Sequence, residues 1–220
     1  RFPSKMNKEI SELREMLKPD LPKLTSMEVD DLTLRRYLIA FCKITAAHKA
    51  ILATNAWRSE FNVPNISSES PGVSKFQAMK CSIPLEAYDK GGRSVLYCAY
   101  RNYKKEGRDI KQLTVFIVYI LETLISKCRD VDNFCIIVDM KDFTIASMDY
   151  GAVTTLFKVM QDHYPERLGF MLIINAPTVF SVSWNIVKKW LNERTSNKIV
   201  FLEESNLNSY IDPASVPLHV

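Results

Sequence analysis

The chain has 220 residues, of which 47% are hydrophobic and 25% are charged, and its net charge is +4. This composition is that of an ordinary globular protein and excludes extended disorder, and the length allows one sizeable core or a small helical domain packed on a larger one. The small positive charge does not indicate a nucleic-acid partner, but it is compatible with anionic membrane surfaces.

The first sixty residues are predicted to form helices. Residues 4–18 place apolar side chains at helical spacing, with Ser4 as the expected N-terminal cap. A second helix is expected to begin after Asp30 or Asp31, and a third to run from about residue 45 to residue 61. Together these elements predict a small helical region at the start of the chain.

A polar segment at 62–75, interrupted by Pro, Ser and Gly, is predicted to be a linker. It divides the chain into a helical region at 1–62 and a second domain at 76–220. In that domain, strands are expected at 85–88, 95–100, 134–139, 169–175 and 198–202, and helices at 110–128, 149–163 (capped by Asp149) and 178–193. The alternation of strands and helices predicts an α/β fold with a mostly parallel sheet and right-handed crossovers.

The sequence carries none of the common catalytic signatures. It has no GxxxxGK[ST] phosphate loop, no GxGxxG after a strand, no GxSxG elbow and no HExxH motif. His163, next to Asp162, is predicted to be a helix-end histidine, because no nucleophile motif accompanies it. The five cysteines are dispersed, and no Cys/His cluster has ligand spacing. We therefore expect free thiols in a reducing compartment, no metal site, no catalytic residue and no enzyme activity.

The helix expected at 178–193 is apolar on nearly all of its faces. Such a helix is either buried or contacts something apolar outside the fold. The pattern alone leaves two interpretations open: a plain core helix, or a lid whose inner face contacts a lipid and whose outer face contacts a bilayer. Lys188 and Lys189 in the same helix would suit phosphate headgroups.

Several stretches share their order and spacing with one known family. They are Asp31–Leu38, Trp57-Arg58, Asp89–Arg93, Ile137-Val138-Asp139, Tyr164-Pro165-Glu166-Arg167, Ile174-Asn175-Ala176-Pro177, Phe180 and Lys198–Leu202. In this order they cover nearly the whole chain and closely resemble the CRAL-TRIO domain. The resemblance is to the branch that contains the phosphatidylinositol/phosphatidylcholine transfer proteins.

The resemblance implies a lipid-binding domain whose pocket has the sheet as its floor and a mobile gate helix at 178–191 as its cover. The gate and pocket residues would be Phe180, Trp184, Val187, Trp190 and Leu191. In phosphatidylinositol-binding members, the glutamate of the PER motif and the lysine that opens the last strand bind the headgroup; here they are Glu166 and Lys198. Lys43 is available where those members carry an Arg-Lys pair. A buried phosphodiester requires such a cation.

The expected ligand is a phosphatidylinositol-like phospholipid, with no other cofactor. The protein would be cytoplasmic, attach transiently to membrane surfaces and exchange lipid with them, without a nucleic-acid partner. Phosphatidylcholine-binding members of the family carry hydroxyl residues in the strand before the aspartate, and residues 134–139 have none. The resemblance therefore disfavours phosphatidylcholine and leaves open a sterol, retinoid or tocopherol-like ligand. A further alternative is a lipid-sensing regulatory module of a larger protein, because the chain begins without Met and additional domains are expected.

Overall fold

The computed structural model of the chain describes residues 3–218, which form two compact units. The first unit contains the residues up to Ile66 together with Met160–Arg167. The second contains Ser67–Val159 together with the residues from Leu168 onward. The division at residue 66 falls inside the polar segment 62–75. The short stretch directly before Leu168 is assigned to the first unit although it lies far along the chain.

The first unit is built from three helices around one core. Its elements are α1 (Ser4–Leu17), a 3-10 turn (Lys18–Lys23), α2 (Asp31–Phe41), α3 (Ile44–Glu60) and a second 3-10 turn (Val63–Asn65). Ile10, Leu13 and Leu17 recur at helical spacing on α1 and are buried in a core shared with α2 and α3. The three predicted helices are thus confirmed to within about one residue of their bounds.

Of the helix caps in this unit, the sequence predicts only that of α1; for α2 it predicts a start after Asp30 or Asp31. Asp30 caps α2, because its carboxylate accepts a hydrogen bond of 2.8 Å from the Thr33 N–H. The prediction that Ser4 caps α1 is wrong. Pro3 occupies the cap position, since its carbonyl accepts the first helical hydrogen bond from the Asn7 N–H at 3.1 Å, and Ser4 is the first helical residue.

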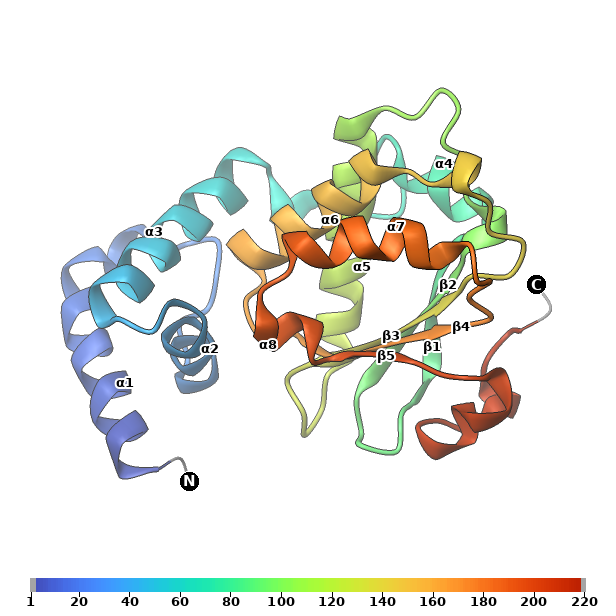
Figure 1. Ribbon diagram of the computed structural model, residues 1–220. Helices are drawn as coiled ribbons and strands as arrows, with labels where there is room; N and C mark the ends of the chain where they lie inside the picture. The colour runs from blue at the N-terminus through green and yellow to red at the C-terminus, as the bar shows by residue number, and fades with distance from the viewer. Residues whose placement is uncertain (1–2, 219–220) are drawn as a thin grey trace. The chain divides into compact units, whose positions relative to one another are not determined.

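The second unit contains a sheet of five strands within the described residues (Figure 1). The strands are β1 (Ser82–Tyr88), β2 (Ser94–Ala99), β3 (Phe134–Asp139), β4 (Leu168–Ile174) and β5 (Ile199–Phe201). They lie side by side in chain order. β1 is antiparallel to β2, and the other pairs are parallel. The predicted mostly parallel sheet is therefore confirmed.

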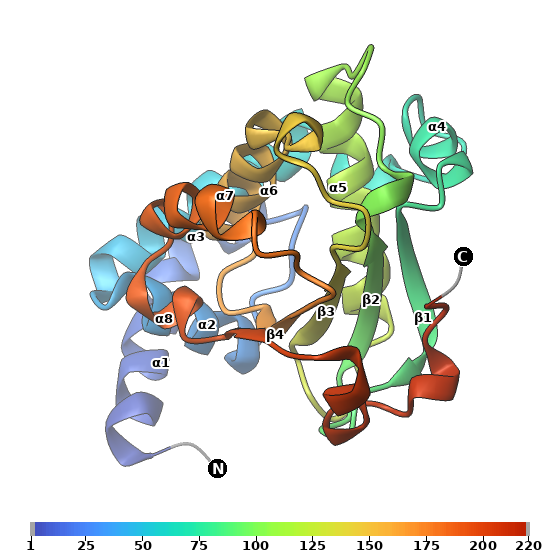
Figure 2. The same cartoon turned by 45° about the vertical axis from the view of Figure 1, so that its right-hand side comes forward.

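The helices of this unit lie between the parallel strands in sequence. They are α4 (Val73–Ala78), α5 (Ile110–Ser126), α6 (Tyr150–His163, whose end enters the first unit), α7 (Phe180–Val187) and α8 (Glu193–Ser196). Because neighbouring strands follow chain order and their crossovers have one hand, α5, α6 and α7 cover the same face of the sheet, as Figures 1 and 2 show. Asp149 caps α6 as predicted, accepting from the Ala152 N–H at 2.9 Å.

Side chains alternate between the two faces of the sheet. Leu96, Ile136 and Met171 point to the side of the helices, where a cavity lies. Tyr97 and Ile137 belong to a core on the opposite face, which is covered by the C-terminal segment with its 3-10 turns Glu204–Ser209 and Pro213–Ser215. Both faces are covered, which explains why the central strands are continuous apolar runs rather than alternating ones.

The helix expected at 178–193 is shorter than predicted. α7 ends at Val187, a 3-10 turn covers Lys188–Trp190, and Leu191 is extended. Asn192 then caps α8, because its side-chain oxygen accepts from the Thr195 N–H at 2.8 Å. The apolar pattern continues to Leu191, but the asparagine cap begins a new helix and so interrupts the long one.

Within residues 3–218, no single helix combines the length and the apolar composition of a membrane span. α2 and α3 meet that criterion only as a pair, and they are bent by 116° with respect to each other.

Candidate functional site

A cavity of about 250 Å³ lies between the sheet and the helices of the second unit. Its floor consists of side chains from the central strands: Leu96, Cys98, Ile136, Val138, Met171 and Ile173. Nearly all of its lining residues are apolar. Such a concave apolar site within a folded domain is the usual form of a binding site for a hydrophobic small molecule.

Two helices form the walls of the cavity. α5 contributes Leu113, Phe116, Ile117, Ile120 and Leu121, and α6 contributes Ala152, Val153, Leu156 and Phe157. On each helix these positions recur at intervals of three and four residues, so one continuous stripe faces the cavity. The sequence predicts the apolar helix at 110–128 but does not single out these wall residues. Their spacing is the signal from which they could be identified.

α7 covers the cavity with one face and leaves another face exposed. Phe180, Trp184 and Val187, at positions i, i+4 and i+7, line the cavity. Val182 and Ile186 are 53% and 42% exposed on the other side. The helix therefore contacts the cavity on its inner face, and its outer face presents apolar side chains outward.

The remaining two residues assigned to the gate lie outside the cavity lining. Trp190 belongs to the 3-10 turn that follows α7, and its ring packs edge-on against Tyr150 at a centroid distance of 5.9 Å. Leu191 is the extended residue that ends this turn. The structure thus brings Phe180, Trp184 and Val187 together at the cavity and places Trp190 and Leu191 beyond it.

Aromatic contacts hold α7 against the rest of the unit. Phe180 packs edge-on against Phe143, with centroids 5.1 Å apart, and Trp184 packs in the same way against Phe201 of β5, also at 5.1 Å. Each such pair contributes about 0.5–1.5 kcal/mol beyond the area it buries. Outward movement of α7 would separate both pairs, so these two contacts favour the closed position by about 1–3 kcal/mol in addition to the apolar area that α7 buries.

A polar network, which the sequence did not reveal, lies where the chain leaves β4 for α7. Asn175 has a left-handed backbone with φ of 53°. Its side-chain Nδ2 donates to Asp139 Oδ1 at 3.0 Å and to Glu204 Oε2 at 2.8 Å. The start of the segment that leads into α7 is therefore fixed to the end of β3 and to the C-terminal segment.

Asp139 is the buried centre of this network. Its carboxylate also accepts from the Tyr97 hydroxyl and the Arg101 guanidinium, each at 2.7 Å, and from the Lys141 N–H at 3.0 Å. Burial alone would raise the pKa of this carboxyl, but the hydrogen bonds from Asn175, Tyr97 and its other donors outweigh burial and lower the pKa. Asp139 thus stays ionised and paired inside the fold.

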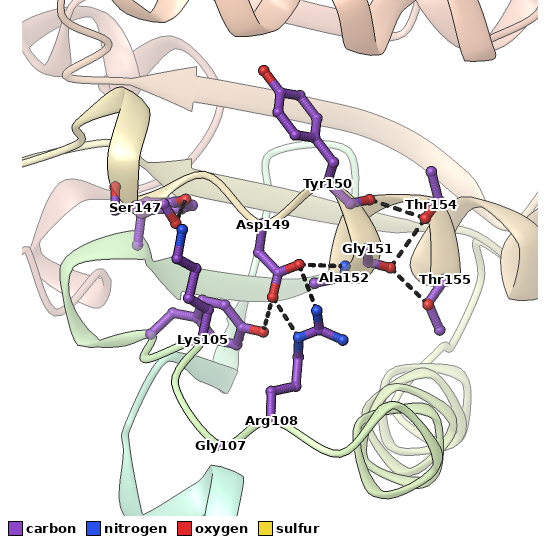
Figure 3. Close-up of polar contacts among 12 residues, drawn as sticks. Lys105, Gly107, Arg108, Ser147, Asp149, Tyr150, Gly151, Ala152, Thr154 and Thr155 are labelled. Carbon is purple, nitrogen blue, oxygen red and sulfur yellow. Dashed lines mark hydrogen bonds and ion pairs between the residues drawn. The ribbon is translucent and has the colours of Figure 1, made fainter.

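A second buried ion pair lies at the cavity itself (Figure 3). Asp149, which lines the cavity, points toward Arg108, whose Nη2 donates to Oδ1 at 3.0 Å and whose Nε lies 2.5 Å from Oδ2. The Tyr103 hydroxyl donates to Oδ2 at 2.8 Å. Sequence reasoning identified Asp149 only as a helix cap and did not identify its partners, which lie about forty residues earlier in the chain.

The predicted headgroup residues lie in different parts of the fold. Lys198 is half-buried directly before β5, and its carbonyl accepts from the N–H of Met171, a cavity-lining residue, at 2.9 Å. Glu166 and Lys43 belong to the first unit. Glu166 is half-buried and has a left-handed backbone with φ of 57°, which is a strained conformation for glutamate; Lys43 is exposed before α3. Strain of this kind is often retained at functional sites.

The remaining candidates from the sequence are His163 and the five cysteines. In the first unit, His163 stacks on Trp57 with ring centroids 3.8 Å apart, and its Nδ1 lies 3.4 Å from the Thr54 hydroxyl. All five cysteines are free thiols in the described chain. Within residues 3–218, no group of three or more His, Cys, Asp or Glu side chains could hold a metal ion.

The fold and the cavity define a hydrophobic-ligand domain, and comparison with known proteins identifies its class. Residues 79–219 match the CRAL/TRIO domain. The chain therefore belongs to the CRAL/TRIO family of lipid-binding and lipid-transfer proteins, which includes phosphatidylinositol transfer proteins.

Three relatives and one solved structure show the extent of the similarity. The chain is 31% identical to CRAL-TRIO domain-containing protein C3H8.02 of Schizosaccharomyces pombe, over 85% of this chain and 44% of that protein. It is 29% identical to phosphatidylinositol transfer protein CSR1 of Eremothecium gossypii, over 62% and 32%, and 28% identical to Sec14 cytosolic factor of S. pombe, over 91% and 76%. The chain thus spans less than half the length of the first two relatives.

The structural comparison concerns the fold. The crystal structure of Sfh5 superimposes with a TM-score of 0.78, covering 94% of this chain and 83% of that chain, at 17% sequence identity. At this identity the match establishes a common α/β architecture. It carries no information on the ligand.

Proposed function

We propose that this domain encloses the acyl chains of a phosphatidylinositol-like phospholipid and exchanges the lipid with membranes. The observation that carries the proposal is the apolar cavity between the sheet and α7. Burial of acyl chains contributes about 0.8 kcal/mol per methylene relative to water. Because the protein interior replaces the bilayer as the solvent of the acyl chains, the free energy of lipid transfer from bilayer to protein is close to zero. The main barrier to transfer is then the displacement of α7.

The headgroup is proposed to contact Lys198, with Glu166 and Lys43 as further ligands. Lys198 is half-buried one residue before β5 and is hydrogen-bonded through its backbone to Met171 of the cavity floor. A lysine at this position can compensate the single negative charge of a phosphodiester. Glu166 can accept hydrogen bonds from inositol hydroxyl groups, and its strained backbone supports a functional role.

The membrane contact is proposed to be made by the outer face of α7. Val182 and Ile186 are exposed there, and Lys188 and Lys189 are exposed in the turn that follows. Apolar side chains beside lysines fit the interface of an anionic membrane, where each favourably placed lysine contributes about 1 kcal/mol. The domain would then act as a cytoplasmic, peripheral and transient membrane binder that releases lipid without converting it.

Two observations favour an alternative ligand, a single hydrophobe such as a sterol, retinoid or tocopherol-like molecule. The cavity of about 250 Å³ is at the small end of ligand pockets, and β3 brings no hydroxyl side chain to it. A regulatory, lipid-sensing module is a further alternative, because the chain spans only 44% and 32% of the first two relatives.

Extraction and mass spectrometry of the lipid that copurifies with the domain would decide between these ligands. For the headgroup proposal, Lys198→Ala and Glu166→Ala should each reduce loading of phosphatidylinositol from vesicles and leave loading of phosphatidylcholine unchanged. Lys111→Ala, which removes an exposed lysine of α5 that is outside both the cavity lining and the proposed membrane contact, is the matched control. Equal losses for both lipids in the Lys198 variant would show damage to the fold and contradict the headgroup assignment.

A further inference from the structure

The two ends of α7 are held by different contacts. Before the helix, Asn175 fixes the incoming segment through the polar network described above. Further along, Tyr150 of α6 contacts both the helix and the turn that follows it. The Tyr150 hydroxyl donates to Ser183 Oγ at 3.3 Å, and the Tyr150 ring packs edge-on against Trp190 at a centroid distance of 5.9 Å. One side chain of α6 thus holds the second half of α7 and its end.

Ser183 is a polar residue on the inner face of an apolar helix. Its spacing from Phe180 and Val187 places it on the same face as these two side chains, and it is fully buried, whereas Ser181 is exposed. A buried hydroxyl is unfavourable unless it has a hydrogen-bond partner. Tyr150 supplies this partner only while α7 lies against the rest of the unit, so the pair favours the closed position of the helix.

The backbone of Tyr150 is fixed independently of α7. Tyr150 is the first residue of α6 and follows Asp149, whose carboxylate caps the helix and is paired with Arg108. The Tyr150 carbonyl accepts from the Thr154 hydroxyl at 2.9 Å. In Figure 3 the side chain of Tyr150 points away from Asp149 and Arg108. Outward movement of α7 would therefore break the contacts of Tyr150 rather than carry this residue along.

We infer that Tyr150 is a positioning residue that latches α7 and sets the rate at which the cavity opens. The latch consists of Tyr150, Ser183 and Trp190, and the cavity lining formed by the described residues includes none of the three. A bound lipid does not replace these contacts, so they stabilise the closed position of the empty and the loaded domain alike. Loss of the latch should raise the rate of opening and leave the equilibrium occupancy by lipid nearly unchanged. The inference rests on the proposed function in taking α7 as the moving element.

Amide hydrogen exchange of residues 178–191, measured by mass spectrometry, tests the latch directly. α7 has eight residues, and a helix of this length is not stable in water alone, so its amides exchange when it leaves the sheet. Tyr150→Phe removes the hydrogen bond and keeps the ring, and Ser183→Ala removes the acceptor. Each should accelerate exchange about fivefold, as expected for one neutral hydrogen bond. The double variant should be no faster than either single one, because both changes remove the same bond.

Two control variants match these changes. Tyr119→Phe removes a hydroxyl of α5 that is outside the cavity lining and accepts from Gln77 at 3.4 Å. Ser181→Ala removes an exposed hydroxyl of α7 and changes helix propensity as Ser183→Ala does. Both controls should exchange like the wild type. Wild-type exchange in the two latch variants, additive effects in the double variant, or equal acceleration in α7, α5 and β3 would each overturn the inference.

Release of lipid connects the latch to the proposed function. The domain is loaded with phosphatidylinositol that carries a pyrene-labelled acyl chain and is mixed with excess phosphatidylcholine vesicles. Release is followed by the loss of energy transfer from Trp184, which lines the cavity, to pyrene. Both latch variants should release lipid about fivefold faster at unchanged equilibrium loading, and unchanged release would overturn the inference. Failure of the wild type to take up the labelled lipid would contradict the proposed function, and amide exchange would still decide on the latch.

Discussion

The carboxylate of Asp139 is expected to contribute strongly to the stability of the second unit. It is fully buried and accepts four hydrogen bonds, from Tyr97, Arg101, Asn175 and the Lys141 N–H. Asp139→Asn keeps the size of the side chain but replaces one acceptor oxygen by a donor. At least one of the present donors would then face another donor, and the guanidinium of Arg101 would lose its counter-ion.

The magnitude follows from these contacts. Removal of one partner from a buried ion pair costs about 3–5 kcal/mol. The free energy of unfolding of a typical domain is about 5–15 kcal/mol, so the substitution should remove a third or more of it. Because Asn175 also loses a partner, the segment that leads into α7 should become less firmly held, and lipid exchange should become faster as stability falls.

Urea unfolding followed by tryptophan fluorescence measures this effect. Trp57→Phe should be introduced as background, since the remaining tryptophans, Trp184 and Trp190, both belong to the second unit. Asp142→Asn is the matched control: this residue lies in the same loop, is exposed, and should change the free energy of unfolding by no more than about 0.5 kcal/mol. If Asp139→Asn lowered the free energy of unfolding by no more than the control does, the reasoning would be refuted.

The same residue predicts a pH dependence. The pKa of Asp139 in the folded state is lower than its ordinary value of 3.8. A group of this kind binds more protons in the unfolded state near that value, so its contribution to stability is complete above it and is lost as the pH falls through the lower, folded-state pKa. The difference in unfolding free energy between the wild type and Asp139→Asn should therefore be constant near neutral pH and shrink below about pH 4.

Three further predictions concern α7, the cavity thiol and a helix cap. Val182→Asp with Ile186→Asp should abolish co-flotation with anionic vesicles and leave the thermal midpoint of unfolding nearly unchanged, because both side chains are exposed; retained flotation would contradict the membrane-contact proposal. Iodoacetamide at pH 8 should modify exposed Cys42 much faster than cavity-lining Cys98, whose pKa is raised to about 12. Peptide mass spectrometry would measure both rates of modification. Equal rates would argue against a closed cavity. Asp109→Ala removes the cap of α5 and should lower the free energy of unfolding by about 1 kcal/mol in the same urea assay, whereas no change would mean that the cap is not needed.

The strands and the mostly parallel sheet could be predicted because the information is local. Phe134–Asp139 is a continuous apolar run, and a strand buried on both faces needs no other signal. Helices between such runs define a parallel sheet with little ambiguity. The cap at Asp149 could be predicted for the same reason, since a cap depends on residues three positions apart.

Long-range polar pairing could not be predicted. Arg101 and Asp139 are 38 residues apart in the chain, and Arg108 and Asp149 are 41 apart. These partners meet because β2 and β3 are neighbours and end at the same edge, so their pairing is a property of the sheet rather than of either segment. The length of α7 was overestimated for a different reason: apolar periodicity continues through Leu191, but the Asn192 cap interrupts the helix.

The C-terminal segment acts as a structural layer in its own right. Leu207, Ile211 and Val216 are buried against Tyr97 and Ile137 on the face of the sheet opposite to α5, α6 and α7. A chain cut after β5 would lose these three side chains, each of which contributes about 1.5–3 kcal/mol to stability when fully buried. The apolar face of the sheet would then be exposed to water. The smallest fragment that can be expressed as a well-behaved monomer is thus expected to end near residue 218, well past the last strand, and shorter versions should aggregate.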